Sequence, residues 1–168
     1  MRRRTLLKVG LATGALLAVA GGSLALLQPA RRDGKFTATG SAIFTALAPA
    51  VLATLLPADA AARSAAIAAY LPRVEAAIDG LPPALQGEVD ELLTIAGSAP
   101  GRLALVGLRS GWAEASAADV QAALSAMRES SLVLRQQAYH ALRDLTSASY
   151  FSDAAPWAAV GYPGPRPV

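Results

Sequence analysis

The sequence predicts an all-α protein, a small helical bundle of five or six helices with an N-terminal signal or anchor helix and an extended, aromatic- and proline-rich C-terminal tail. Apolar residues recur at helical spacing through most of the chain, and no stretch shows the sustained alternation of a β-strand. The hydrophobic fraction is 54% against 16% charged, and much of that excess is alanine. We expect a signal or anchor at 1–30, a linker at 31–40, the helical domain at 41–149 and the tail at 150–168.

The first segment has the layout of an export signal, a cationic start followed by an uncharged run over residues 9–27. Its motif is similar to that of twin-arginine translocation signals, which a receptor reads as an address. The residues that carry this motif are Arg3, Arg4, Leu6, Leu7 and Lys8. An ordinary secretory signal and a plain membrane anchor are the alternatives.

The length of this segment does not decide whether it is a cleaved signal or a retained anchor. As a helix the uncharged run would be about 28 Å long, which barely spans a bilayer core, so a cleaved signal and a retained anchor both fit. Small residues suitable for cleavage lie at 18–20 and near Ala30. In both cases we expect the rest of the chain in the periplasm, either free or anchored to the membrane.

Helical periodicity is strongest in the middle of the chain. One apolar face follows the spacing i, i+3, i+4, i+7 and i+11, and its members are Ile67, Tyr70, Leu71, Val74 and Ile78. Pro49 and Pro72 are expected to kink or split the helices that contain them. The last helix is expected over 131–149, with Leu134 facing inward.

Start and stop signals mark two further helices. The stretch 83–97 has a proline at its start, a glycine at its end and an apolar stripe that begins at Leu85. Ser116 and Asp119 have the spacing of a capping box ahead of the next helix. These signals predict a single helical domain with no internal repeat.

Missing residue types exclude most chemistries. The chain has no cysteine, which excludes disulfides, iron–sulfur clusters, cysteine zinc sites and thiol catalysis. His140 is the only histidine, too few for a bundle di-iron site, and no nucleophile motif lies beside it. No glycine-rich loop has the spacing that cradles phosphate. We therefore expect no active site and no cofactor on this chain.

Charge excludes a further class of partner. From Arg31 onward the chain has eleven basic and twelve acidic residues, a net charge of −1. Proteins that bind nucleic acid carry a basic patch or stripe, and this part of the chain has no such excess. We therefore expect no nucleic-acid partner.

The C-terminal tail contains more aromatic residues than disordered termini usually do. Residues 149–168 hold four of the nine aromatic residues and four of the eleven prolines. Disordered segments are poor in aromatic rings, because such rings give a segment something to bury. We therefore expect the tail to dock on a surface.

Four stretches together resemble one protein family. They are FTALAPAVLATLLP at 44–57, GLPPALQGEVDELLTIAG at 80–97, WAEAS at 112–116 and RQQAYHALRDLTSASYFSDAAPWAAVGYPGP at 135–165. Over about residues 42–165 the chain resembles gluconate 2-dehydrogenase subunit 3. The specific part is the ending, a Tyr-Phe pair followed by a tryptophan and Gly-Tyr-Pro-Gly-Pro.

The resemblance implies a noncatalytic small subunit of a flavin-dependent dehydrogenase of the glucose–methanol–choline type. In that family the large subunit carries FAD but no signal, and the small subunit escorts it through the twin-arginine translocase as a folded complex and stays bound. The tail would bind this partner through Tyr150, Phe151, Trp157, Gly161, Tyr162 and Pro163. The substrate, the electron acceptor and a further cytochrome subunit are left open.

A second interpretation belongs to a different class. The chain would be a free-standing periplasmic or membrane-anchored helical module that binds an unknown ligand. Its tail would then fold back over its own bundle and bind no partner.

Overall fold

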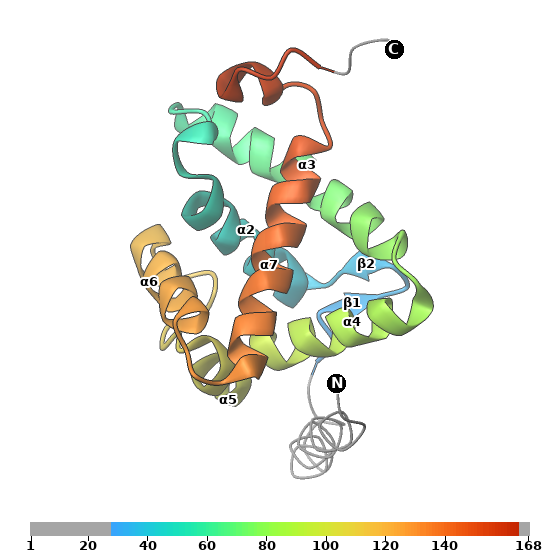
Figure 1. Ribbon diagram of the computed structural model, residues 1–168, viewed down its shortest axis with the longest axis vertical. Coiled ribbons are helices and arrows are strands. Elements are labelled where there is room, and N and C mark those ends of the chain that lie inside the picture. The colour runs from blue at the N-terminus through green and yellow to red at the C-terminus, as the bar shows by residue number, and fades with distance from the viewer. Residues whose placement is uncertain (1–27, 165–168) are drawn as a thin grey trace.

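The computed structural model describes residues 28–164 and confirms the predicted all-α class (Figure 1). Within that range, six α-helices and three short helical turns accompany one two-stranded hairpin. In chain order the elements are β1 (Arg31–Arg32), β2 (Lys35–Phe36), α2 (Ala38–Leu52), η1 (Ala53–Leu55), α3 (Ala60–Asp79), α4 (Pro83–Gly97), α5 (Ala99–Gly101), the π-helical turn η2 (Arg102–Val106), α6 (Ala117–Arg128), α7 (Val133–Phe151) and η3 (Trp157–Val160). The predicted export-signal residues Arg3, Arg4, Leu6, Leu7 and Lys8 lie outside the described residues, as do 165–168.

Helix α2 is the core helix of the bundle. It packs against α3, α4, α6 and α7, and its residues Ile43, Phe44 and Leu47 are fully buried. By length and composition alone, the stretch Ala38–Leu55 is apolar enough to cross a membrane. In the bundle, the neighbouring helices bury part of that apolar surface. Length and apolar composition are thus compatible with membrane anchoring, but the core helix of a folded domain has them equally.

Helix α7 runs through the molecule from one end to the other (Figure 1) and packs against α2, α3 and α6. Its bounds lie two residues later at each end than the predicted 131–149. Leu134 is 44% exposed, because it lies in the first turn, before the helix meets its neighbours. The prediction that Leu134 faces inward is therefore wrong.

Two predicted helix signals can be compared directly with the structure. Ser116 Oγ accepts a hydrogen bond from the Asp119 amide (3.1 Å), which confirms Ser116 as the N-cap. The Asp119 carboxylate accepts from the Ser116 hydroxyl (2.6 Å) and not from the Ser116 amide, so the reciprocal half of the capping box is not formed. Pro72 does not split its helix, since α3 continues from Ala60 to Asp79. Because proline has no N–H, α3 lacks one backbone hydrogen bond at Pro72, and the packing of α3 against α7 outweighs this loss.

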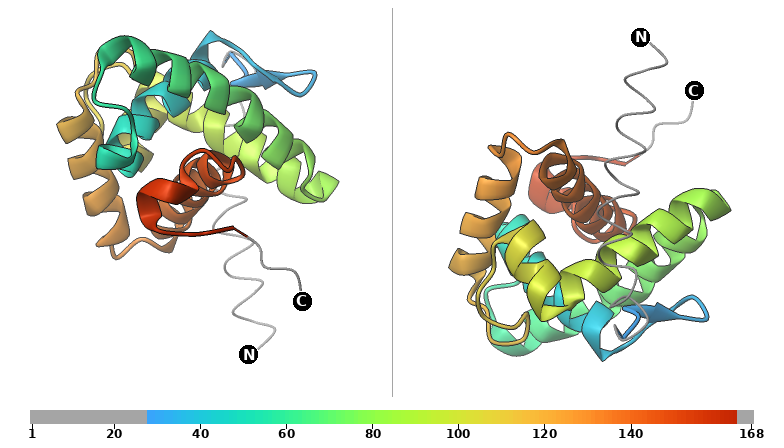
Figure 2. Two further views of the ribbon diagram at one scale, coloured as in Figure 1. Left: turned by 90° about the horizontal axis from the view of Figure 1, so that it is seen from above. Right: turned by 90° about the horizontal axis from the view of Figure 1, so that it is seen from below.

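The segment 31–40 is not a linker, contrary to the prediction. Asp33 and Gly34, with φ of 51° and 76°, form the two-residue turn of an antiparallel hairpin that pairs Arg31 with Phe36. An Asp-Gly pair favours this turn because both of its residues need a positive φ. The hairpin lies on the side of the bundle opposite α6 (Figure 1 and Figure 2).

A buried arginine fixes the hairpin to the bundle. The Arg31 side chain is only 3% exposed and forms ion pairs with Asp79 of α3 and, at 2.7 Å, Asp90 of α4. Glu75 of α3 accepts from the amide of Phe36 (2.7 Å). Charged hydrogen bonds to a buried guanidinium are stronger than neutral ones, so the segment is held as part of the fold.

The folded domain also begins earlier than residue 31. Ala30 is fully buried, its amide donates to Thr94 Oγ1 (3.3 Å), and its carbonyl accepts from the Thr37 amide (2.9 Å). A Cβ at Gly40 would lie 2.3 Å from the Ala30 carbonyl oxygen, so only glycine allows this approach. The predicted boundary between 30 and 31 therefore falls inside the domain.

Candidate functional site

The predicted tail begins as part of the bundle. Helix α7 continues through Phe151, and Tyr150 is only 6% exposed. The Tyr150 hydroxyl donates to the Leu55 carbonyl (2.8 Å), and burial raises the pKa of Tyr150 more than nearby Arg73 lowers it. The prediction that Tyr150 binds a partner is therefore corrected, because its ring is a core side chain.

An arginine of α3 fixes the turn that follows α7. Arg73 donates from Nε to the Ser149 carbonyl (3.1 Å) and from a terminal nitrogen to Asp153 (2.9 Å). Asp153 in turn accepts from the Ala155 amide (3.0 Å), and Pro156 is buried. The chain's own bundle thus holds the segment as far as Pro156.

Beyond Pro156 the chain folds back around one indole ring. Trp157 Nε1 donates to the Phe151 carbonyl (2.8 Å), and the Tyr162 amide donates to the Trp157 carbonyl (3.0 Å). The rings of Trp157 and Tyr162 meet edge to face, with centroids 5.2 Å apart. Gly161 has a φ of 70°, a conformation that favours glycine and allows the chain to reverse. We call residues 157–163 the aromatic turn.

The aromatic turn is displayed at the end of the molecule where α7 ends (Figure 1). Tyr162 is 48% exposed, Pro163 is exposed, and Trp157 is half-buried. The tail is therefore not extended over 150–160 as predicted, because helix α7 and η3 occupy most of that stretch. The residues predicted to bind a partner divide into two groups: Tyr150 lies in the core and Phe151 is half-buried at its edge, whereas Trp157, Gly161, Tyr162 and Pro163 form the aromatic turn.

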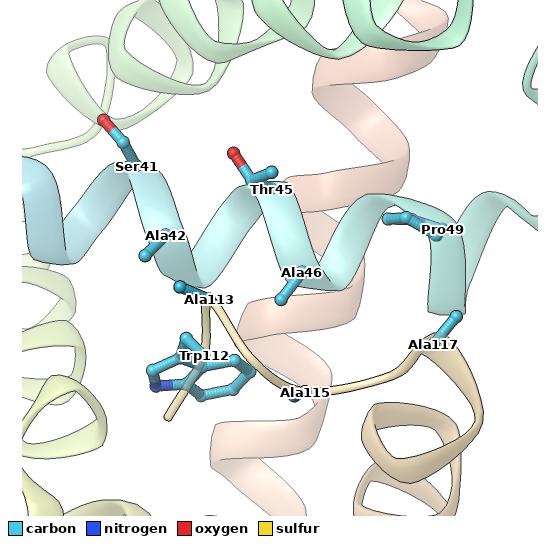
Figure 3. A pocket seen from close by; sticks show the side chains of 9 residues that line it. All are labelled: Ser41, Ala42, Thr45, Ala46, Pro49, Trp112, Ala113, Ala115 and Ala117. Atoms are coloured by element: carbon cyan, nitrogen blue, oxygen red, sulfur yellow. The ribbon is translucent and has the colours of Figure 1, made fainter. Parts of the chain in front are cut away.

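A shallow depression of about 310 Å³ lies between α2 and the loop that precedes α6 (Figure 3). Its lining residues are Ser41, Ala42, Thr45, Ala46, Pro49, Trp112, Ala113, Ala115 and Ala117. The Trp112 indole N–H is already bonded to the Ala96 carbonyl (2.8 Å), and no charged side chain lines the depression. The depression suits a small apolar group and offers no chemistry.

Titratable side chains form no catalytic cluster in the described part of the chain. His140 is exposed on α7, and its ring contacts the neighbouring Tyr139 with centroids 5.1 Å apart. Within residues 28–164, no three His, Cys, Asp or Glu side chains lie close enough to hold a metal ion. Of the acidic residues on α4, Asp90 is paired with Arg31.

Besides Tyr150, three hydroxyl side chains are buried on α3 and α7. Tyr70 and Thr146 are fully buried, and Ser149 is 1% exposed. Among the described residues, the hydroxyls of Tyr70 and Ser149 have no hydrogen-bond partner, and Thr146 donates to the Leu142 carbonyl (2.8 Å). Burial raises the pKa of Tyr70 strongly, and the adjacent Thr146 hydroxyl lowers it by less. These hydroxyls lie where α3 and α7 pack against each other.

Comparison of the chain with protein-family models, with curated proteins and with solved structures finds no match.

Proposed function

We propose that this chain is the noncatalytic small subunit of a flavin-dependent dehydrogenase of the glucose–methanol–choline type. It escorts the large subunit through twin-arginine export into the periplasm and stays bound to it. FAD belongs to the large subunit, and this chain brings the address and a binding surface. The observation that carries the proposal is the aromatic turn, an ordered Trp157–Tyr162 pair displayed beyond the bundle.

The geometry of the aromatic turn suits a protein interface. Tryptophan and tyrosine are enriched among the residues that dominate binding energy. Backbone and indole hydrogen bonds already hold the pair in one conformation, so little conformational entropy remains to be lost on binding. A half-buried indole beside an exposed phenol offers a partner both apolar area and a hydroxyl for a hydrogen bond.

The address supports the same proposal. Twin-arginine export moves folded cargo, so a cofactor inserted in the cytoplasm can cross with its protein. The described part of this chain has no cluster that could hold a metal ion. Folded export is therefore better explained by a bound partner than by this domain alone.

The alternative function rests on the depression beside α2. A free-standing helical module would bind a small apolar ligand there, between Ala42, Ala46 and Trp112 (Figure 3). The two functions involve different residues, so variants of the aromatic turn are expected to affect only partner binding, and variants of the depression only ligand binding.

The experiment tests the aromatic turn by co-expression with a flavin dehydrogenase large subunit of the glucose–methanol–choline type. Trp157→Ala with Tyr162→Ala is expected to weaken the complex roughly 100-fold or more, since interface anchors contribute about 2 kcal/mol or more each. Co-purification and calorimetric titration measure the loss. Truncation after Ser149 is a poorer test, because it also removes Tyr150 and Asp153, which bind the bundle.

The matched control is Leu85→Ala on α4, which removes another exposed apolar side chain. This variant is expected to bind like the unaltered chain, and all variants are expected to keep their helical circular dichroism. An aromatic-turn variant that binds the large subunit at full strength would overturn the proposal.

A further inference from the structure

Exposed apolar side chains gather at the end of the molecule opposite the aromatic turn. Leu132, Val133 and Leu134 are 61%, 61% and 44% exposed, and Leu103 is 55% exposed. They are four of the seven large apolar side chains that are exposed within residues 28–164, so the exposure is concentrated there. We call these four residues the apolar end.

The two parts of the apolar end are joined to each other. Arg135, in the first turn of α7, donates to the carbonyls of Leu105 (2.9 Å) and Val106 (3.3 Å) in η2. Figure 1 and Figure 2 show the start of α7 beside the segment that contains α5 and η2. Leu103 on η2 and the residues 132–134 therefore lie on neighbouring segments.

Two half-buried arginines flank the apolar end in the sequence. Arg102 precedes Leu103, Arg135 follows Leu134, and neither arginine pairs with a carboxylate in the described range. Arg102 Nε is buried without a hydrogen-bond partner from that range. Arg128 pairs with Glu129, so that neighbouring pair adds no net charge. Apolar side chains flanked by arginines are the pattern of a surface that meets anionic lipid.

The chain also enters the fold at this end. The Ala30 amide is bonded to Thr94, three residues before α4 ends at Gly97, and α5 and η2 follow directly. The described chain therefore begins close to η2, and the uncharged run 9–27 immediately precedes it in the sequence. Helix α7, with 19 residues, separates this end from the aromatic turn by about 28 Å.

The arrangement of Leu132, Val133 and Leu134 favours lipid over a protein partner. Val133 and Leu134 are consecutive residues of α7, so their side chains point about 100° apart, and Leu132 precedes the helix as its N-cap. A flat protein surface would cover one of these directions, whereas acyl chains and headgroups can surround both.

We propose that the apolar end of this domain rests on an anionic membrane surface, with Leu103, Leu132, Val133 and Leu134 in the interfacial region and Arg102 and Arg135 at the headgroups. The aromatic turn then points away from the membrane. This inference does not depend on the proposed escort function.

The test uses the full chain, whose lack of cysteine allows one thiol to be introduced at a time. Val133→Cys and Leu103→Cys are labelled with an environment-sensitive fluorophore, and the chain is reconstituted with vesicles of phosphatidylethanolamine and phosphatidylglycerol. The matched control is Leu85→Cys, an exposed leucine at the far end of α4. We expect vesicles to shift the emission of probes at 103 and 133 to the blue and to remove their quenching by iodide, and to leave the probe at 85 quenched.

Equal iodide quenching at 133 and 85 in the presence of vesicles would overturn the proposal. Protection of position 133 by a dehydrogenase large subunit without lipid would also overturn it, because the apolar end would then be a protein interface. Vesicles of phosphatidylcholine alone are expected to protect less, and equal protection would overturn the role given to Arg102 and Arg135.

Discussion

Two buried tyrosines differ in what their hydroxyls contact. Tyr150 donates to the Leu55 carbonyl at 2.8 Å, whereas the fully buried hydroxyl of Tyr70 has no hydrogen-bond partner among the described residues. A buried polar group without a partner loses its hydrogen bonds to water and gains none, which costs stability. The same chemical change at the two positions therefore has different consequences.

Tyr150→Phe is expected to lower the free energy of unfolding by about 1 kcal/mol, because it leaves the Leu55 carbonyl without its donor. Tyr70→Phe is expected to leave the free energy of unfolding unchanged or to raise it. Urea denaturation followed by circular dichroism measures both. A larger loss for Tyr70→Phe than for Tyr150→Phe would contradict this prediction.

The raised pKa of Tyr70 adds a pH dependence. Above the ordinary tyrosine pKa of 10.0, the unfolded chain gains stability by losing this proton, while the folded chain keeps Tyr70 neutral. The contribution of Tyr70 to the free energy of unfolding is therefore fully present below that pKa and falls as the pH rises above it. Tyr70→Phe is expected to reduce this alkaline loss, measured as urea midpoints at about pH 8 and about pH 11.

A variant of His140 tests the proposal that this chain is noncatalytic. His140 is exposed, and within residues 28–164 its one aromatic contact is with Tyr139. His140→Ala is expected to leave the dehydrogenase activity of the assembled complex unchanged and to alter stability by about 0.5 kcal/mol or less, as surface substitutions do. Loss of activity with assembly intact, or flavin or haem absorbance in the purified chain, would show a site that this account lacks.

At the scale of elements, two glycines in helices differ in their surroundings. Gly40 of α2 faces the Ala30 carbonyl, which a Cβ would approach to 2.3 Å, whereas a Cβ at Gly87 of α4 would meet nothing within 4 Å. Gly40→Ala is expected to displace the hairpin and cost about 1–3 kcal/mol, as overpacking does. Gly87→Ala is expected to stabilise the chain by about 0.5–1 kcal/mol.

Hydrogen exchange separates the effect on the hairpin from the effect on the bundle. In Gly40→Ala, the Phe36 and Thr37 amides, which donate to Glu75 and to Ala30, are expected to lose protection first. Unaltered protection of these amides would mean that the N-terminal segment contributes nothing to the packing of α2.

The helices were predictable from the sequence, and the hairpin was not. Caps such as Ser116 and periodic faces such as that of α3 are local signals. Asp33-Gly34 is also a local turn signal, but its strands have only two residues each, too short to alternate visibly. What holds the hairpin is Arg31 with Asp79 and Asp90, residues far apart along the chain that no spacing rule connects.

At the scale of the whole molecule, composition marked the aromatic tail as a segment that packs on a surface but not the turn that it forms, and it did not mark the apolar end. Trp157 and Tyr162 stand out in a chain with nine aromatics. Leu85 and Leu134 follow the period of their helices, so the sequence predicted buried positions, yet both are 44% exposed because they lie in first turns. Periodicity finds the face of a helix, but tertiary packing decides how far along the helix that face is covered.

The export proposal is tested by Arg3→Lys with Arg4→Lys. The double variant keeps the charge but removes the guanidinium groups, so a receptor that reads arginine geometry is expected to reject it. Flavin dehydrogenase activity should then remain in the cytoplasmic fraction, measured against a periplasmic marker enzyme. Arg32→Lys, an exposed arginine outside the motif, is the control for a change of arginine elsewhere, and normal periplasmic activity of the double variant would contradict the escort proposal.

The burial of Ala30 has a consequence for maturation. A processing protease needs several residues of accessible, extended backbone around the bond it cuts. In a chain that has already folded, the bonds beside Ala30 are closed to it, because the amide and the carbonyl of this residue are bonded within the domain. The other region with small residues, 18–20, lies outside the described residues. A recombinant protein that starts at Arg31 would lack this anchoring residue, so expression of the mature domain is best begun upstream of Pro29.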